Sequence, residues 1–479
     1  MSSKEIDIQE STSSPSEVSS LNDDLDNMHL ESESSVEEMS DDEMDSNSWN
    51  EIDSEPDEEF MEDHGLVDEV ISALEDNTVH PIDCYRHFIT DEIIDLMVRE
   101  TNRYAEQYLE AHDISRRSKY RQWKPTTYEE ILKFLGIIIE MGLVQVLQLN
   151  HYWNSSRLYG LEIVRSTMPR ERFELLLKFL HFSNNNNKDS NQDRIFKLKP
   201  LLDLLKERFS SVYIPGSVVS IDESMIPWRG RLLFKQYIPG KTHKYGIKMY
   251  KLAATNGYTW NYAIHTGEKE SMPGVGHAQG IVMKLLDGLD GCYRTVVADN
   301  FYTSIPLAKY LLEHDTYLIG TLRSNRVGSA KVLDEDLGRG EVYGFQSQDG
   351  IKLIRWKDKK DVLMISTRPS HSASVVDSGK TNYQNQRIIK PQVVLDYNEG
   401  RQGTDLSDQL STYYTCLRKS LKWYRKVAFE LIFGMALVNS YLIYKENYIE
   451  SKVTILQFRE SLVRSLLPGT PMEKLKPGP

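Results

Sequence analysis

The hydrophobic pattern of this chain changes at Pro215-Gly216, a turn signal near its middle. Before it, apolar residues recur every three or four positions, which is the spacing of helices that bury one face. After it come short runs rich in β-branched residues, which are typical of strands. The chain is therefore predicted to join a mainly helical region, residues 78–213, to an α/β region in which helices flank a mixed sheet.

Four amphipathic helices are predicted before the turn signal. Thr90 is placed to cap the first of them. Thr127 and Glu130 form a capping-box pattern at the start of the second. Apolar stripes within residues 173–180 and 201–209 predict the other two.

Two aspartates directly follow predicted strands of the second region. The strands are expected at residues 218–221, 248–254, 260–265, 295–298 and 317–321, with helical patterns at 280–287 and 304–313. Asp222 follows the first strand and Asp299 the fourth. Ligands of open sheets bind at the carboxyl ends of strands, so these two carboxylates are candidates for a shared site. Taken singly, each aspartate is better explained as a turn former.

A pair of carboxylates at one sheet edge suits the cleavage of phosphodiesters. Two divalent ions ~3.5–4 Å apart can activate the attacking oxygen and stabilise the leaving one. Hard ions such as Mg²⁺ require oxygen ligands, and Asp and Glu supply them. Asp405 and Asp408 are further candidates, three residues apart at a predicted helix start. Their alternative role is to complement the dipole of that helix.

Several motifs in one order resemble the piggyBac family of transposases. They are SIDESMIPWRGR at 220–231, KTHKYGIKMY at 241–250, ADNFYTSIPLA at 298–308 and GTDLSDQLSTYYTCLRKSLKW at 403–423, with ETNRYAEQY at 100–108 upstream. The resemblance covers about residues 78–450. It implies an RNase H-like catalytic domain whose acidic triad is Asp222, Asp299 and Asp405, with Asp408 as a fourth carboxylate. Thr404 stands where the family usually has valine.

The resemblance also implies an activity and its requirements. The expected reaction is metal-dependent DNA strand cleavage and strand transfer at TTAA-flanked transposon ends, through a hairpin intermediate and with two Mg²⁺ or Mn²⁺ ions. A homodimer on double-stranded DNA in the nucleus is expected. PiggyBac-type transposases usually end in a cysteine-rich zinc-binding module, and this chain has none before Pro479. A domesticated DNA-binding or chromatin-associated protein that no longer transposes is therefore the alternative, and another RNase H-like nuclease a remote third.

The same resemblance divides the chain. The expected units are a disordered acidic tail (1–65), a helical dimerisation and DNA-binding domain (78–217 and 411–465), a catalytic domain (218–325 and 391–410) and an insertion domain (326–390). The insertion is expected to lie against DNA or a partner subunit, and residues 411–450 to fold back onto the N-terminal helices.

Basic residues near the candidate carboxylates are expected to contact DNA phosphates. They are Arg229, Arg231, Lys241, Lys244 and Lys248. A second basic group with an aromatic residue contains Arg418, Lys419, Lys422 and Trp423. Trp423 is equally well explained as a base-stacking platform or as a core residue. For the cations, the alternative is a solvated, salt-bridged surface.

Charge divides the chain unevenly. Residues 1–63 carry 23 Asp and Glu against one Lys, whereas the remainder carries 56 Lys and Arg against 48 Asp and Glu. A block of like charge with few aromatics predicts a disordered tail attached to a mildly basic body.

The three cysteines form no CxxC pair, which favours a reducing compartment. The apolar run 427–444 is interrupted by polar residues, so a buried helix is expected and no membrane role.

Overall fold

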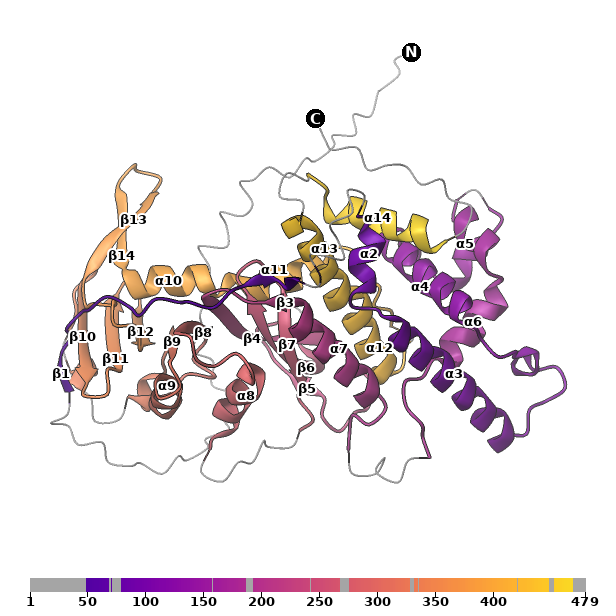
Figure 1. The fold of residues 1–479 in the computed structure, drawn as a ribbon, viewed down its shortest axis with the longest axis horizontal. Coiled ribbons are helices and arrows are strands. Elements are labelled where there is room, and N and C mark those ends of the chain that lie inside the picture. Colours follow the sequence, from indigo (N-terminus) through magenta and orange to yellow (C-terminus); the bar gives the residue numbers. More distant parts are fainter. Residues whose placement is uncertain are drawn as a thin grey trace, which may run out of the picture.

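A computed structural model describes most of the chain beyond the acidic tail. The described residues are 49–68, 70, 79–156, 158–186, 193–241, 243–267, 275–327, 331–334, 336–419, 421–447 and 452–467. Helices form one end of the elongated molecule and strands form the other, with the central sheet between them (Figure 1).

Two separated segments of chain build the helical end. The first contains α2 (Pro81–Arg86), α3 (Asp91–Ala111), η4 (Lys119–Gln122), α4 (Tyr128–Leu143), η5 (Leu149–Trp153), α5 (Glu162–Thr167), α6 (Arg170–Phe179) and α7 (Lys199–Val212). The second contains α12 (Trp423–Phe429), the π-helical η9 (Glu430–Met435), α13 (Ala436–Asn447) and α14 (Ile455–Leu466). Because α13 packs against α2 and α14 against α4, the second segment folds back onto the first.

The four predicted helices are confirmed as α3, α4, α6 and α7. Thr90 is the N-cap residue of α3, although its side chain makes no capping hydrogen bond. The capping box predicted for α4 is half formed. Thr127 accepts from the amide of Glu130 at 3.4 Å, but the Glu130 carboxylate bonds instead to Arg172 and Thr126. A cation within reach outweighs a neutral amide as the partner of a carboxylate.

The five predicted strands are confirmed as the centre of the sheet. They are β4 (Val218–Pro227), β6 (Tyr245–Ala254), β7 (Thr259–Ile264), β8 (Arg294–Ala298) and β9 (Thr316–Thr321). Their spatial order is β7-β6-β4-β8-β9, in which β4, β8 and β9 run parallel and β6 runs antiparallel. This is an RNase H-like sheet. The prediction was too short for β4, which continues six residues past Ile221 because β6 still pairs with it.

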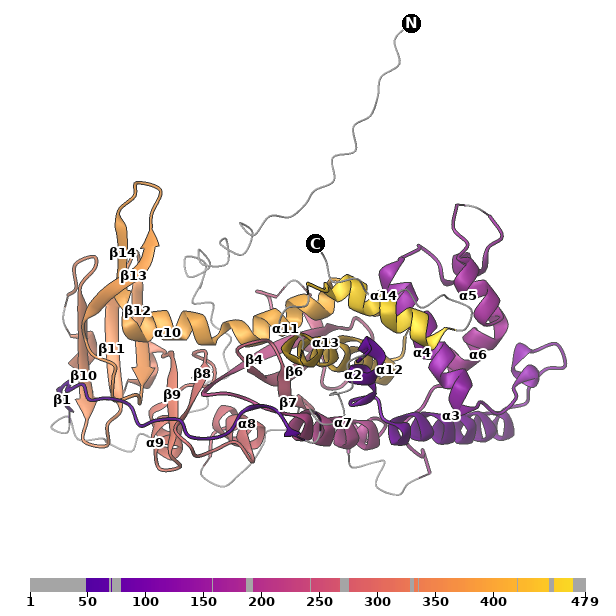
Figure 2. The same ribbon diagram turned by 45° about the horizontal axis from the view of Figure 1, so that its top comes forward.

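The predicted insertion extends this same sheet. Its strands β12 (Asp361–Ser366), β11 (Lys352–Lys357) and β10 (Val342–Ser347) continue the ladder beyond β9. A separate hairpin of β13 (Val375–Thr381) and β14 (Arg387–Pro391) projects from the strand-rich end (Figure 2). The short β5 (Gln236–Tyr237) adds to the other side of β6.

Helices cover both faces of the sheet (Figure 2). One face is covered by α10 (Gln392–Gly400) and α11 (Gln402–Thr412), and the other by α7, α8 (His277–Leu286) and α9 (Ile305–Leu312). Two glycines allow the close packing of the first pair. A Cβ on Gly400 would lie 2.5 Å from Val297 Cγ2, and one on Gly403 would lie 2.3 Å from the carbonyl oxygen of Ala254.

The end of the acidic segment is ordered, which corrects the prediction of a disordered tail through residue 65. Residues 1–48 lie outside the described part. Residues 49–66, here called the strap, run along the sheet (Figure 1). The strap begins with β1 (Trp49–Glu51), which pairs with β10, and ends with β2 (Gly65–Leu66), which pairs with β3 (Tyr213–Ile214).

Ion pairs explain why composition misled the prediction for the strap. Asp57 binds Arg368 at 2.5 Å, and Glu62 pairs with Arg294, which is 1% exposed. The amide of Glu58 donates to the hydroxyl of Tyr317 at 3.1 Å. Net charge averages over a segment and ignores such specific partners. The strap therefore crosses the amino ends of β8 and β9, where Arg294 and Tyr317 lie.

Within the described residues, one helix, Trp423–Asn447, is long and apolar enough to cross a membrane by length and composition alone. Of its most apolar stretch, 89% is buried inside the structure. It is thus the buried helix expected from the sequence. The three cysteines are unpaired.

Candidate active site

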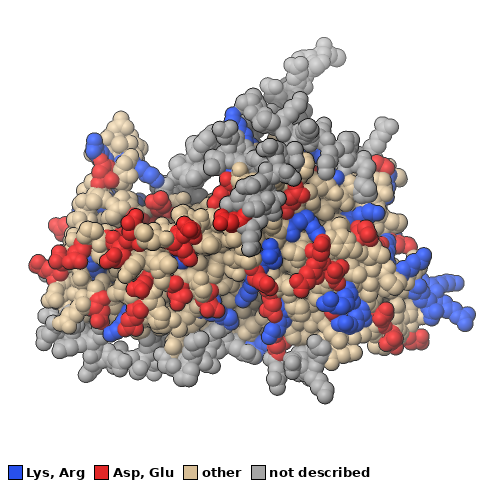
Figure 3. Space-filling model, in the orientation of Figure 1, with Lys and Arg blue, Asp and Glu red and all other residues tan. Residues whose placement is uncertain are grey.

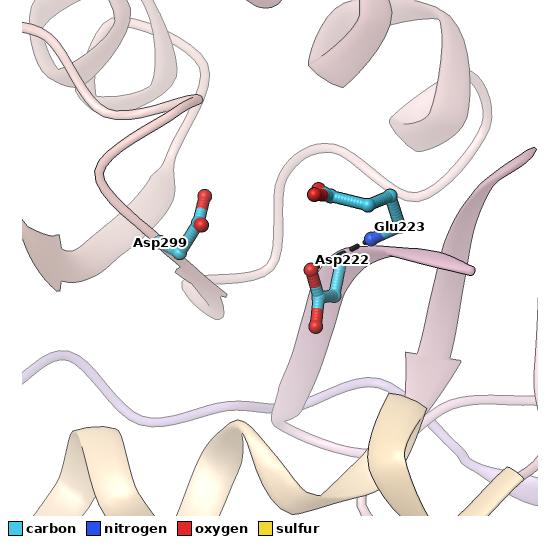
Figure 4. A group of neighbouring side chains, drawn as sticks. All are labelled: Asp222, Glu223 and Asp299. Carbon is cyan, nitrogen blue, oxygen red and sulfur yellow. Dashed lines mark hydrogen bonds between the residues drawn. The ribbon is translucent and has the colours of Figure 1, made fainter. Parts of the chain in front are cut away.

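The candidate site lies where β8 ends and β4 continues. The parallel ladder between these strands runs from Val218 opposite Thr295 to Ile221 opposite Ala298. Asp222 and Asp299 are the next residues of the two strands, so they stand at the same level (Figure 4). The end of a parallel ladder thus brings together two residues 77 positions apart.

A third carboxylate, Glu223, completes a cluster that the sequence analysis missed. One oxygen each from Asp222, Glu223 and Asp299 lie within 4.8 Å of one another. The hydroxyl of Tyr302 donates to Glu223 at 3.4 Å, and the amide of Phe301 donates to Asp299 at 3.0 Å. Neighbouring strand residues ordinarily face opposite sides, which is why adjacency gave no signal for Glu223.

Burial makes these carboxylates costly to ionise. It raises the pKa of Asp222 well above its usual range, with Glu223 and Asp299 adding to the effect and Lys241 opposing it. Burial, and then the charge of Glu223, raises the pKa of Asp299 to about 6. Like charges held close together and partly out of water disfavour the charged form, and a cation placed among them would restore it.

Two lysines, one in β6 and one in the turn before it, lie beside the cluster, and a third lysine of β6 binds Asp408. The ammonium of Lys241 donates to the carbonyl oxygen of Glu223 at 3.0 Å, and that of Lys248 lies 4.0 Å from the Glu223 carboxylate. Lys251 binds Asp408 at 2.5 Å and is 1% exposed. The structure therefore places cations between the candidate carboxylates rather than only around them.

Lys241 connects the two halves of the predicted acidic set. Burial lowers its pKa, but the charges of Asp222, Glu223, Asp408 and Asp405 outweigh burial and raise it. Asp405 and Asp408 lie on α11, which Gly403 and a hydrogen bond of 3.2 Å from the Thr404 amide to Ser220 Oγ hold against β4. Asp405 and Asp408 are thus outside the cluster of three carboxylates, but their charges act on Lys241, and Asp408 is engaged by Lys251.

The basic residues after β4 fall into two groups. Arg229, Arg231 and Lys244 are exposed. Lys248 is buried instead, with its ammonium 4.2 Å from the ring centre of Phe301. The register of β6 turns Lys248 toward the carboxylates, away from the position of a surface phosphate contact.

The second basic group surrounds the start of α12. Lys419 and Lys422 are exposed, whereas Arg418 lies over the ring of Tyr152 at 4.9 Å. Trp423 is half-buried, and Phe234 meets its ring edge-on at 5.3 Å. One part of the Trp423 ring is thus packed in the fold, and another part is accessible to a ligand.

The residues of the cluster fit a hard divalent cation. Within the described residues, the cluster at Asp222, Glu223 and Asp299 offers only carboxylate oxygens, the ligands that Mg²⁺ and Mn²⁺ prefer. Burial and the neighbouring carboxylates raise the pKa of Asp222 and that of Asp299, and a bound cation would favour their ionised forms. The fold and the site together define a class of protein. Its members have an RNase H-like sheet and carboxylates at the ends of two central parallel strands.

Comparison with known proteins narrows this class. Residues 80–441 match the family model described as Transposase IS4. Human PiggyBac transposable element-derived protein 3 is 28% identical over 83% of the chain, and human PiggyBac transposable element-derived protein 2 is 25% identical over 81%. The chain covers 67% and 65% of these relatives. It belongs to the transposase family, and to the piggyBac type within it.

A solved structure supports the same assignment. It is a piggyBac transposase synaptic complex with hairpin DNA, which the chain resembles with a TM-score of 0.72 and 28% identity. The match covers 85% of this chain and 83% of the other. The RNase H-like fold predicted from the motifs is thereby confirmed.

Proposed function

We propose that this chain is a DNA transposase that cleaves DNA strands and joins them at TTAA-flanked transposon ends. The observation that carries the proposal is the cluster of Asp222, Glu223 and Asp299 at the end of the β4–β8 ladder. Membership of a transposase family and the likeness to a transposase–DNA complex support it. A homodimer and a nuclear location are part of the proposal.

Each carboxylate has a role in this scheme. Asp222 and Asp299, with Asp405 by the family resemblance, would hold two Mg²⁺ or Mn²⁺ ions, with Glu223 as a further oxygen donor and Asp408 nearby. When bound, such ions activate the attacking oxygen and stabilise the leaving one. Arg229, Arg231 and Lys244 are exposed beyond β4 and bind phosphates of the duplex. The packing of α11 on the sheet fixes Asp405 and Asp408 relative to the cluster.

Cleavage of labelled duplex tests the proposal. Purified protein with Mg²⁺ or Mn²⁺ is expected to nick a duplex carrying a terminal repeat beside TTAA, and Asp222→Asn to abolish nicking while the protein remains folded. Asp290→Asn, in the exposed turn before β8, is the matched control and should cleave normally. If the parent protein cleaves no such duplex in either metal, the enzymatic proposal is wrong.

A second candidate is a DNA-binding protein that keeps the fold without transposing. The names of the human relatives, which call them transposable element-derived, favour it. It predicts duplex binding without cleavage, and a gene that lacks flanking inverted repeats and TTAA. The carboxylate cluster favours the first candidate, because a protein that only binds DNA gains nothing from costly half-buried carboxylates.

A further inference from the structure

Four cationic side chains converge at the start of the helix Trp423–Asn447, at some remove from the carboxylate cluster. They are Lys178 at the end of α6, Lys197 before α7, and Lys422 and Arg425 at the start of α12. The pKa of Lys422 is lowered, first by burial and then by the charges of Arg425, Lys178 and Lys197. Arg425 likewise lowers the pKa of Lys197 after burial. Lys422 is therefore close enough to the other three cations to be repelled by each of them.

No carboxylate among the described residues forms a salt bridge with any of these four side chains. The guanidinium of Arg425, 4% exposed, donates to the carbonyl oxygens of Leu180, at 2.9 Å, and Lys178. The ammonium of Lys178 lies 4.9 Å from the ring centre of Tyr108, and that of Lys197 lies 5.4 Å from the ring centre of Tyr424. Neutral carbonyls and aromatic faces hold these cations without cancelling their charge.

His181 adds no counter-charge to this group. It is 1% exposed, and its ring bonds to the Tyr424 hydroxyl at 3.2 Å and to Asn185 at 3.0 Å. The pKa of His181 is lowered to about 3, chiefly by burial; the hydrogen bond to Asn185 opposes this shift, and the charges of Lys197, Arg425 and Lys422 add to it. The imidazole is thus neutral at physiological pH, and the surroundings favour an added anion.

An aromatic contact links this group to the loop after the catalytic strand. Trp423 packs edge-on against Phe234, which lies in the loop after β4. The same loop carries the exposed Arg229 and Arg231, just beyond Asp222. On the face shown in Figure 3, cations also gather over the helical end while acids dominate the strand-rich end. The contact between Trp423 and Phe234 therefore places Lys422, the residue before Trp423, beside the loop that follows the catalytic strand.

We propose that Lys178, Lys197 and Lys422, together with the charge of the buried Arg425, form a binding site for the backbone phosphates of the DNA strand that runs from the carboxylate cluster past Trp423. The inference rests on the proposed function and names the surface that holds the substrate on the helical side. A phosphate supplies the negative charge that the site lacks, and Lys and Arg are its usual partners in DNA complexes.

The salt dependence of binding tests this site. The probe is a fluorescein-labelled duplex with a central TTAA, and the dissociation constant is measured against salt concentration. Each of Lys178→Gln, Lys197→Gln and Lys422→Gln is expected to reduce the slope of log K against log salt by about 0.9, and the triple variant by about three times as much. Lys422→Arg should restore the slope. Lys309→Gln, a partly exposed site on α9 at the other end, is the control.

Two further readings separate this inference from the proposed function. The triple variant should bind Mn²⁺ as tightly as the parent protein, because the carboxylate cluster is unchanged. The melting temperature of the triple variant should not fall, because the substitutions remove like charges that repel one another. A triple variant with the parent's slope overturns the inference and leaves the proposed function standing. A parent protein that binds no duplex overturns both.

Discussion

At the scale of single residues, the sequence located two of the three clustered carboxylates. Asp222 and Asp299 were predictable because each follows a run of β-branched residues, and parallel strands end at one edge. Glu223 was not, because its oxygen reaches the cluster from the position next to Asp222. The engagement of Asp408 by Lys251 was also hidden, since it depends on the packing of α11 against β6.

The raised pKa of Asp299, about 6, makes the metal-free protein sensitive to pH. Its folded pKa exceeds the unfolded value of 3.8, so this carboxyl contributes stability that is complete below about pH 4 and is lost as pH rises through about 6. Asp299→Asn should therefore raise the unfolding free energy at pH 7 by up to about 3 kcal/mol and flatten its fall between these pH values.

Thermal unfolding in EDTA across this pH range measures the effect. In the parent protein, Mg²⁺ should raise the melting temperature more above pH 6 than below it, because only the ionised cluster binds the cation. Asp287→Asn, an exposed site at the end of α8, is the control. An Asp299→Asn protein that is less stable than the parent at pH 7 would contradict the expectation.

At the scale of elements, periodicity located the helices α3, α4, α6 and α7 and the strands of the central sheet. It could not give the length of β4, because the end of a strand depends on which neighbour still pairs with it. Nor could it show that β10, β11 and β12 extend that sheet, because strand pairing is long-range information.

Gly403 is the point at which α11 meets the sheet. In Gly403→Ala the new methyl would lie 2.3 Å from the Ala254 carbonyl oxygen and 2.9 Å from Ser220 Oγ, so α11 must shift. We expect a loss of about 1–3 kcal/mol in the unfolding free energy, measured by urea denaturation. Cleavage should fall further than stability alone explains, because Asp405 and Asp408 move with the helix.

Gly276→Ala provides the matched control for this change. Gly276 is the N-cap residue of α8 with a φ of -64°, and a Cβ there meets nothing within 4 Å. Its substitution should leave cleavage intact. Equal behaviour of the two alanine variants would show that α11 tolerates displacement, contrary to the packing argument.

At the scale of the whole molecule, the strap is the feature that composition misrepresented. It fastens the strand-rich end to the helical end through β1 and β2, and its acids meet arginines on the way. Its course leaves the carboxyl ends of β4 and β8 uncovered by the strap, since Glu62 and Glu58 contact the amino ends of β8 and β9.

Loss of a strap carboxylate should weaken the fold. Glu62→Gln leaves the guanidinium of Arg294, 1% exposed, with carbonyl oxygens of Leu289, Pro215 and Gly216 but without its carboxylate. Since Glu62 is itself one third exposed, solvent screening reduces the cost to about 1–2 kcal/mol. Calorimetric unfolding at low and high salt measures it. Glu59→Gln, an exposed neighbour, should change nothing.

The unbroken ladder from β5 to β10 has a mechanical consequence. Strands β10, β11 and β12 cannot move as a separate domain about a hinge, because Met364, Ile365 and Ser366 of β12 are paired with β9. A force applied to that end is transmitted through β9 to β8, the strand that ends at Asp299. The sheet is therefore expected to behave as one rigid unit, with the carboxylate cluster near its middle. Motion during a reaction is then limited to twisting of the sheet or to movement of the helices around it.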